Sequence, residues 1–188
     1  MSVIVFDTET SGKADHKLPF DHPTQPRLAQ LGFIGKDNDG KVTSEVNLFV
    51  KPDGWVMPKE TSDFHGITQE FLEEHGLPIK VVMSVFLRAV KGNDFLIAHN
   101  SAFDMIIIQN ELSRIGWLNQ LDQEETKVFC TMAATTDICK IQGKYGYKWP
   151  TMQEAYKHYF GEEFEDAHDA MADVRACMAV YEKLQEEN

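Results

Sequence analysis

The chain has 188 residues, of which 43% are hydrophobic and 26% charged, enough for one domain with a sizeable core and too few for two ordinary ones. Its 18 Lys and Arg against 30 Asp and Glu give a net charge of -12, which disfavours partners attracted by positive charge alone, such as duplex DNA or an anionic membrane. No stretch approaches the roughly 20 apolar residues of a membrane span, charge appears too early for a signal peptide, and the three cysteines form no C-x-x-C pair, so we expect a single cytoplasmic domain over residues 1–188 with no membrane partner.

The first quarter of the chain predicts a three-stranded meander. Residues 3–6 are an apolar, β-branched run typical of a strand buried on both faces. Residues 12–26 contain three prolines and no periodicity, which indicates a long surface loop. Residues 28–35 predict a second strand, and alternating apolar residues from 42 to 50, after a turn at 37–40, predict an antiparallel third strand.

From residue 69 onward, helical periodicity alternates with short apolar strands. Helices are expected over residues 69–75 and 79–90, each stopped by a nearby glycine. A strand over residues 95–99 leads into a helix whose apolar face ends before Gly116. Residues 128–130 predict another short strand.

Two helices are expected to complete the domain. Thr151 and Glu154 form a capping box for a helix that ends at Gly161. The final helix has a predicted buried stripe of Ala170, Val174, Cys177, Tyr181 and Leu184. This order of elements predicts an α/β fold with a mixed five-stranded sheet and helices on both faces.

Asp7 and Glu9 lie two residues apart at the end of the first predicted strand. Side chains alternate along a strand, so both carboxylates project to the same face and repel each other unless a cation lies between them. Oxygen-only ligands favour hard divalent ions such as Mg²⁺ or Mn²⁺. The pair taken alone also fits an ordinary exposed strand end.

A second polar cluster, residues 98–104, lies where the strand over 95–99 ends and a helix begins. Asp104 falls in the first turn of that helix, where a capping or dipole-stabilising role worth about 0.3–1 kcal/mol competes with a ligand role. Phe103 fits a core position as well as a ligand contact, and His99 fits a hydrogen-bonded histidine near the edge of the sheet.

A third cluster, residues 167–173, opens the final helix. Asp173 lies one turn beyond Asp169, whereas His168 precedes Asp173 by five residues, about 140° away around an ideal helix. His168 and Asp173 can therefore serve one site only if His168 lies at or before the first turn. Taken alone, the segment fits a helix with a polar first turn.

Together the three clusters resemble the three motifs of the DEDDh family of exonucleases, which includes the proofreading subunit of bacterial replicative DNA polymerase, ribonuclease T and oligoribonuclease. The matching segments are Asp7-Thr8-Glu9-Thr10, Asn100-Ser101-Ala102-Phe103-Asp104 and His168-Asp169-Ala170-Met171-Ala172-Asp173. His65-Gly66-Ile67-Thr68 resembles the family's H-G-I segment, and Phe160-Gly161 ahead of the third motif is also typical. The likeness covers essentially the whole chain.

The resemblance implies a ribonuclease-H-like fold, which agrees with the predicted order of elements. It also implies a metal-dependent 3′–5′ exonuclease that releases nucleoside 5′-monophosphates from the 3′ end of single-stranded nucleic acid, with DNA favoured over RNA. A DNA polymerase or a second copy of the chain is left open as a further partner. The implied ligands of two Mg²⁺ or Mn²⁺ ions are Asp7, Glu9, Asp104 and Asp173. The implied contacts to the last nucleotides are Thr10, His65, Ile67, Asn100 and Phe103.

A physical mechanism accompanies the resemblance. Four converging carboxylates repel strongly, and two divalent ions about 3.5–4 Å apart neutralise them and supply the positive charge that the acidic surface lacks. His168 is expected to take the proton of the attacking water, a role that suits neutral imidazole near pH 7. Stacking on a base without reading its edge would leave little sequence preference.

Two departures from the family pattern and two alternative functions stand beside this interpretation. The loop over residues 13–26 is longer than in compact relatives, and Gln30 stands where many members have glutamate. One alternative is a non-catalytic module of the same fold that binds a nucleic-acid end or a polymerase, against which the complete set of acids and His168 argues. The other is a zinc hydrolase using some of the seven histidines, disfavoured because no H-E-x-x-H motif is present.

Overall fold

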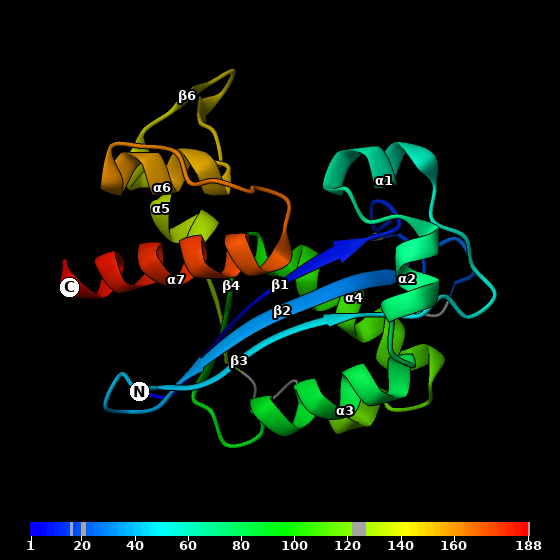
Figure 1. Ribbon diagram of the computed structural model, residues 1–188. Helices are drawn as coiled ribbons and strands as arrows, with labels where there is room; N and C mark the ends of the chain where they lie inside the picture. Colours follow the sequence, from blue (N-terminus) through cyan, green and yellow to red (C-terminus); the bar gives the residue numbers. More distant parts are fainter. Residues whose placement is uncertain (16, 20–21, 122–126, 188) are drawn as a thin grey trace.

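A five-stranded mixed sheet lies at the centre of the computed structural model, which describes residues 1–15, 17–19, 22–121 and 127–187 (Figure 1). The strand order is β3-β2-β1-β4-β5. Both β1–β2 and β2–β3 pair antiparallel, whereas β4 pairs parallel with β1 and with β5. The strands are β1 (Val3–Thr10), β2 (Leu28–Lys36), β3 (Val42–Phe49), β4 (Phe95–Ala98) and β5 (Lys127–Cys130). This sheet confirms the predicted fold class.

Helices cover both faces of the sheet, because side chains alternate along β1 and β1 is apolar on both sides. Ile4 and Phe6 pack with α3 and α4, whereas Val3 and Val5 pack with α6 and α7. The helices are α1 (Lys59–His65), α2 (Gln69–His75), α3 (Ile79–Val90), α4 (Ser101–Arg114), η1 (Leu118–Gln120), α5 (Thr131–Cys139), α6 (Met152–Phe160) and α7 (Ala170–Glu186). Within the described part of the chain, no helix is long and apolar enough to cross a membrane.

Most of the predicted helices are confirmed with their ends. The helices expected over residues 69–75 and 79–90 are α2 and α3. Thr151 and Glu154 form both hydrogen bonds of the capping box of α6, which ends at Gly161 in a left-handed conformation with φ 79°. All five residues of the predicted stripe of α7 are buried.

Three elements were not expected from the sequence: α1, α5 and a small hairpin of β6 (Gln142–Gly143) and β7 (Gly146–Tyr147). Helix α1 buries no residue, so it has no apolar period to detect. Helix α5 contains three threonines, which have low intrinsic helix propensity. The hairpin strands have two residues each, too few for an alternation to show.

The predicted surface loop over residues 12–26 forms no helix or strand among its described residues; His16, Phe20 and Asp21 lie outside them. Part of this loop is buried, contrary to the expectation of a surface segment. Gln25 is 3% exposed, accepts a hydrogen bond from the Asp15 N–H and donates to the Asp15 carbonyl. Arg114 on α4 donates to the carbonyls of Gln25 and Pro26, so the end of the loop is fixed against α4.

Candidate active site

The end of β1 carries Asp7 and Glu9 to the face of the sheet covered by α7. Side chains alternate along β1, and Val3 and Val5, at the same parity as Asp7, pack in the cluster that α7 shares. Gly32 on β2 pairs with Asp7. A Cβ atom on Gly32 would lie 3.0 Å from the backbone of Ala170, so this glycine lets the first turn of α7 approach Asp7 closely.

Asp104 reaches the same place from the other face. It lies in the first turn of α4, immediately after the end of β4, and is 2% exposed. Its Oδ1 atom accepts hydrogen bonds from the Thr8 backbone N–H at 3.1 Å and from the Thr8 hydroxyl at 2.7 Å. Asp104 therefore joins α4 to β1 between Asp7 and Glu9, which goes beyond the capping role that its position in the sequence allowed.

The beginning of α7 supplies the third part of the cluster. Asp169 is the N-cap and accepts hydrogen bonds from the N–H groups of Met171 and Ala172. His168 lies before the cap in a left-handed conformation with φ 75°, and its backbone N–H donates to Asp173 Oδ2 at 2.8 Å. His168 thus lies before the first turn, as a shared site with Asp173 requires. Ligand atoms of Glu9, His168 and Asp173 all lie within 4.8 Å of one another.

Burial and mutual repulsion raise the pKa values of all four carboxyls. Burial, followed by repulsion from Asp104, raises the pKa of Asp7 well above its ordinary value. Burial and the charge of Asp173 raise the pKa of Glu9 to about 8. Burial raises the pKa of Asp104 to about 7 in spite of the hydrogen bonds from Thr8, and burial also raises the pKa of Asp173.

The chemistry of this donor set fits divalent cations. Among the described residues, no lysine or arginine forms an ion pair with any of the four carboxylates. Buried carboxylates that repel one another without a basic partner are costly unless they are protonated or bind cations. Oxygen ligands with one nearby imidazole suit hard or borderline divalent ions.

In the absence of metal ions, the protein is expected to lose stability as the pH rises from about 4 to 8. The folded state binds protons at these carboxyls more tightly than the unfolded chain, so their contribution to stability is complete below their unfolded pKa values near 4. It is lost as the pH rises through the folded values, about 7 for Asp104 and about 8 for Glu9. Melting temperatures in EDTA should fall by about 5 °C or more between pH 5 and 8.

Two comparisons control this measurement. Saturating Mn²⁺ should raise the melting temperature at pH 8 more than at pH 5, because the ion binds the assembled, deprotonated site. Glu9→Gln should reduce the fall in EDTA, since it removes one of the titrating groups. A wild-type melting temperature that is independent of pH in EDTA would contradict the proposed electrostatics.

The predicted H-G-I segment fixes α1 to the end of β1. The Nδ1 atom of His65 accepts a hydrogen bond from the Ile67 N–H at 3.1 Å, so Nε2 carries the proton and donates to the Thr10 carbonyl at 3.2 Å. Burial lowers the pKa of His65. Gly66 ends α1 with φ 77°, a left-handed conformation that favours glycine. Three of the five predicted nucleotide contacts, Thr10, His65 and Ile67, are therefore joined by hydrogen bonds.

The other two predicted contacts lie at the beginning of α4. Asn100 is exposed at the N-cap with φ 69°, and its side chain makes no capping hydrogen bond. Phe103 is half-buried and packs against the core. The neighbouring His99 has both ring nitrogens in hydrogen-bond distance of partners, Thr131 Oγ1 at 3.0 Å and the Pro150 carbonyl at 2.9 Å, which supports its interpretation as a structural histidine.

Sequence reasoning did not identify Phe64. This residue ends α1 beside His65, is 62% exposed, and its ring centroid lies 4.1 Å from that of His168. The aromatic contact spans the opening between α1 and the beginning of α7. An exposed phenylalanine in a helix without an apolar period was the available signal.

Gln30, the departure noted on the second strand, supports the beginning of α7. Its side chain is fully buried; Nε2 donates to Asp169 Oδ2 at 3.0 Å and to Asn47 Oδ1 at 2.9 Å, while Oε1 accepts from the Ala170 N–H at 3.4 Å. We expect Gln30→Leu to lower the free energy of unfolding by about 1–3 kcal/mol, because these polar groups lose a partner. Urea denaturation measures this, with Gln120→Leu, at an exposed glutamine, as the control; equal losses in the two variants would contradict the assignment.

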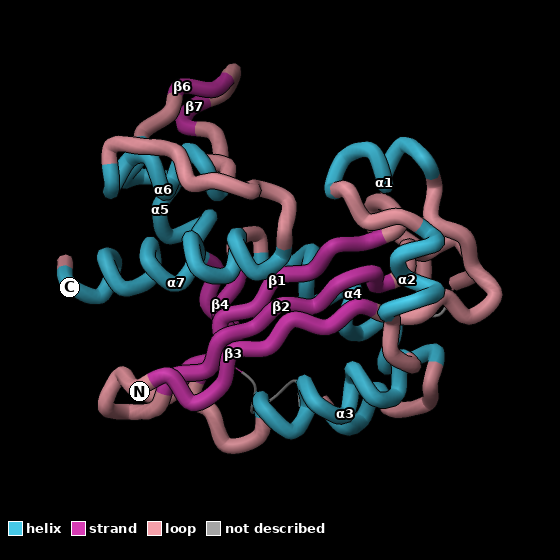
Figure 2. Tube along the Cα trace, viewed as in Figure 1, coloured by secondary structure: helices cyan, strands magenta, loops and turns pink. Residues whose placement is uncertain are grey.

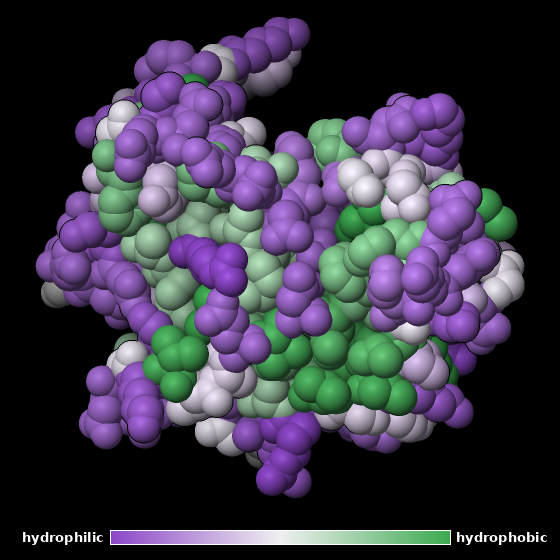
Figure 3. Space-filling model, in the orientation of Figure 1, coloured by the Kyte–Doolittle hydropathy of each residue, from purple (hydrophilic) through white to green (hydrophobic). Residues whose placement is uncertain are grey.

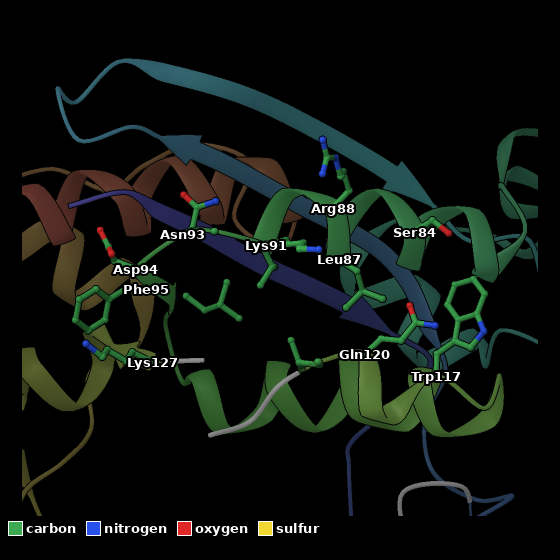
Figure 4. A pocket seen from close by; sticks show the side chains of 14 residues that line it. Ser84, Leu87, Arg88, Lys91, Asn93, Asp94, Phe95, Trp117, Gln120 and Lys127 are labelled. Atoms are coloured by element: carbon green, nitrogen blue, oxygen red, sulfur yellow. The ribbon is translucent and has the colours of Figure 1, made fainter. Parts of the chain in front are cut away.

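A cavity of about 740 Å³ lies elsewhere (Figure 4). It is bounded by α3, by η1 and by the first residues of β4 and β5, Phe95 and Lys127. This is the opposite edge of the sheet from Asn100 and Asp104, which follow the end of β4. No predicted site residue lines it.

Comparisons with known proteins agree with the carboxylate site. The RNase_T family model, described as Exonuclease, matches residues 4–181. The chain is 28% identical over 177 residues to DNA polymerase III subunit epsilon of Treponema pallidum, covering 94% of this chain and 73% of that protein. It is 29% identical over 138 residues to the protein of the same name from Buchnera aphidicola, covering 73% of this chain and 55% of that protein. The chain therefore spans only part of these relatives.

The fold also matches solved structures. Escherichia coli exonuclease I in complex with a dT13 oligonucleotide aligns with a TM-score of 0.78 and 20% identity, covering 98% of this chain and 41% of that chain. A zinc-bound form of exonuclease I with single-stranded DNA aligns with a TM-score of 0.79 and 21% identity, covering 100% of this chain and 41% of that chain. At these identities the likeness establishes the shared fold.

Proposed function

Since the chain belongs to the exonuclease family, we propose that it hydrolyses the terminal phosphodiester bond at the 3′ end of single-stranded nucleic acid, DNA in preference to RNA, and releases nucleoside 5′-monophosphates. The observation that carries this proposal is the convergence of four carboxylates and one exposed histidine at the ends of β1, β4 and α7. The structures of exonuclease I with single-stranded DNA support the choice of substrate.

Asp7, Glu9, Asp104 and Asp173 are proposed to hold two divalent ions, Mg²⁺ or Mn²⁺. When bound, such ions neutralise the carboxylates, lower the pKa of water and stabilise the negative charge of the leaving 3′ oxygen. The protein's contribution is to position the ligands: Thr8 orients Asp104 through two hydrogen bonds, and the His168 backbone N–H orients Asp173. Both contacts leave the second carboxylate oxygen available.

His168 is proposed to accept the proton of the attacking water. Its ring lies at the opening of the cluster, near Glu9 and Asp173, and is exposed to solvent, so the proton can leave after the reaction. The contact with Phe64 restricts the ring from the side of α1. The last nucleotides would then lie against Thr10, His65, Ile67, Asn100 and Phe103, which surround the cluster from β1, α1 and α4.

The test is hydrolysis of matched 5′-labelled single-stranded DNA, single-stranded RNA and duplex DNA in Mg²⁺. We expect the single strand of DNA to shorten by one nucleotide at a time and to release 5′-monophosphates, with slower reaction of RNA and duplex. A DNA strand with a 3′-terminal phosphorothioate linkage is the matched control and should resist hydrolysis.

Binding of all three nucleic acids without hydrolysis in Mg²⁺ or Mn²⁺ would contradict the proposal and favour a non-catalytic module of the same fold. The relatives named as DNA polymerase III subunits support an association with a DNA polymerase. Co-sedimentation of the chain with a replicative polymerase subunit tests that association independently of the hydrolysis.

A further inference from the structure

The β6–β7 hairpin projects from the body of the protein beside α6 (Figures 1 and 2). Its strands pair antiparallel around a two-residue turn, Lys144 and Tyr145. All eight residues from 142 to 149 are exposed, and the surface of the projection is largely hydrophilic (Figure 3). A hairpin of this length is not stable by itself, so its retention in the fold calls for a role.

The hairpin segment reverses the charge of the protein. Residues 138–153 contain Lys140, Lys144 and Lys148 and no acidic residue, whereas the whole chain has a net charge of -12. Lys148 pairs with Glu154 at 2.6 Å. Among the described residues, Lys140 and Lys144 form no ion pair. Two positive charges therefore remain available for an anionic partner.

Exposed aromatic side chains alternate with these lysines. Tyr145 is 92% exposed, Trp149 69% and Tyr147 44%. None of the three belongs to a hydrophobic core cluster of the described residues. The Lys144 Nζ atom lies 5.1 Å from the centroid of the Tyr145 ring, which keeps the cation and the ring on one side of the turn. Interleaved lysines and exposed rings are the chemistry that binds phosphates and stacked bases of a single strand.

The base of the hairpin is fixed next to the catalytic cluster. The carbonyl of Pro150, which follows the hairpin, lies 2.9 Å from Nε2 of His99. His99 immediately precedes Asn100 and the helix that carries Asp104. A strand whose 3′ end lies at the carboxylates can therefore continue along the hairpin without crossing the core.

We infer that the β6–β7 hairpin is a second binding surface for the substrate strand, contacting the phosphates and bases that lie 5′ of the nucleotide being removed. The inference rests on the proposed function, because it takes the same substrate. The hairpin would compensate locally for the repulsion between an acidic protein and a nucleic acid. It would also keep the strand bound between successive cleavages.

The test compares a long and a short substrate with a triple variant, Lys140→Gln with Lys144→Gln and Tyr145→Ser. The substrates are the single strand dT20 and the p-nitrophenyl ester of thymidine 5′-monophosphate, which is too short to reach the hairpin. We expect KM for dT20 to rise about tenfold or more, since each phosphate contact and stacked base contributes to affinity. The rate on the ester should stay within about twofold of wild type. Lys80→Gln with Lys91→Gln, at exposed lysines of α3, is the control for the lost charges.

Binding gives an independent readout. With Ca²⁺ in place of Mg²⁺ to slow turnover, the dependence of log Kd for dT20 on log salt should be less steep in the triple variant by about 1.4, or about 0.7 for each lost phosphate contact. Unchanged KM and Kd for dT20 would overturn the inference, as would an equal loss on both substrates. If wild type hydrolyses neither substrate, the proposed function fails, while the dT20 binding comparison still decides whether the hairpin binds nucleic acid.

Discussion

Asp7→Asn and Asp173→Asn are each expected to lower the rate of exonuclease hydrolysis by several orders of magnitude. Each change removes one of the four carboxylates that are proposed to hold the divalent ions, and asparagine keeps the size of the side chain while losing its charge. The fold should survive, because the cluster contributes repulsion to the metal-free protein: burial and neighbouring carboxylates raise the pKa values of both residues. Single-turnover rates on a single-stranded DNA, with melting temperatures in EDTA, measure both expectations.

Asp169→Asn is the matched control for this pair. Asp169 lies at the same helix end as Asp173, but its carboxylate caps α7, a role that asparagine fulfils as well. Its rate should remain within about tenfold of wild type, the Gln30 contact being the main loss. Excess EDTA should abolish wild-type activity, and Mg²⁺ or Mn²⁺ should restore it. Near-normal turnover of Asp7→Asn, or activity that persists in EDTA, would remove the metal site from the mechanism.

His168→Asn is expected to lower the hydrolysis rate by about 10²–10⁴-fold, the usual contribution of a general base. Asparagine is the sharper substitution here because His168 has φ 75°, and asparagine tolerates a left-handed conformation better than alanine. The backbone N–H that donates to Asp173 is retained, so metal binding and nucleic-acid binding should remain. The wild-type rate should fall toward acidic pH, since a protonated imidazole accepts no proton, and the variant should lack this fall.

The control is His158→Asn, at an exposed histidine of α6, which should leave both the rate and its pH dependence unchanged. A purely structural role for His168 makes the opposite forecast: a lower melting temperature with a normal rate per folded molecule. Single-turnover rates from pH 5.5 to 8.5 for both variants, with melting curves at each pH, separate these outcomes. If His168→Asn kept a normal rate at every pH, the proton acceptor would have to be sought elsewhere.

Local patterns in the sequence were sufficient for the main elements of the fold. The apolar run over residues 3–6 predicted a strand with two buried faces, and the helices over 69–75 and 79–90 were found with their ends. These features depend on neighbours in the chain: the alternation of a strand, the 3.6-residue period of a helix and a capping box within one turn. Where such patterns were short or absent, as in α1 and the β6–β7 hairpin, the elements were not predicted.

The sequence by itself determined which residue types are available and that Asp7 and Glu9 share a face, because the parity of a strand is a local property. Only the tertiary structure decided that Asp104 bonds to Thr8 across 96 residues and that Gln30 holds the cap of α7. It also decided that Phe64 lies against His168 and that the lysines and aromatic rings of the hairpin project into solvent near the site. Such contacts depend on the register between strands and on how closely the helices pack on the sheet, and these are set by the whole core and not by any one segment.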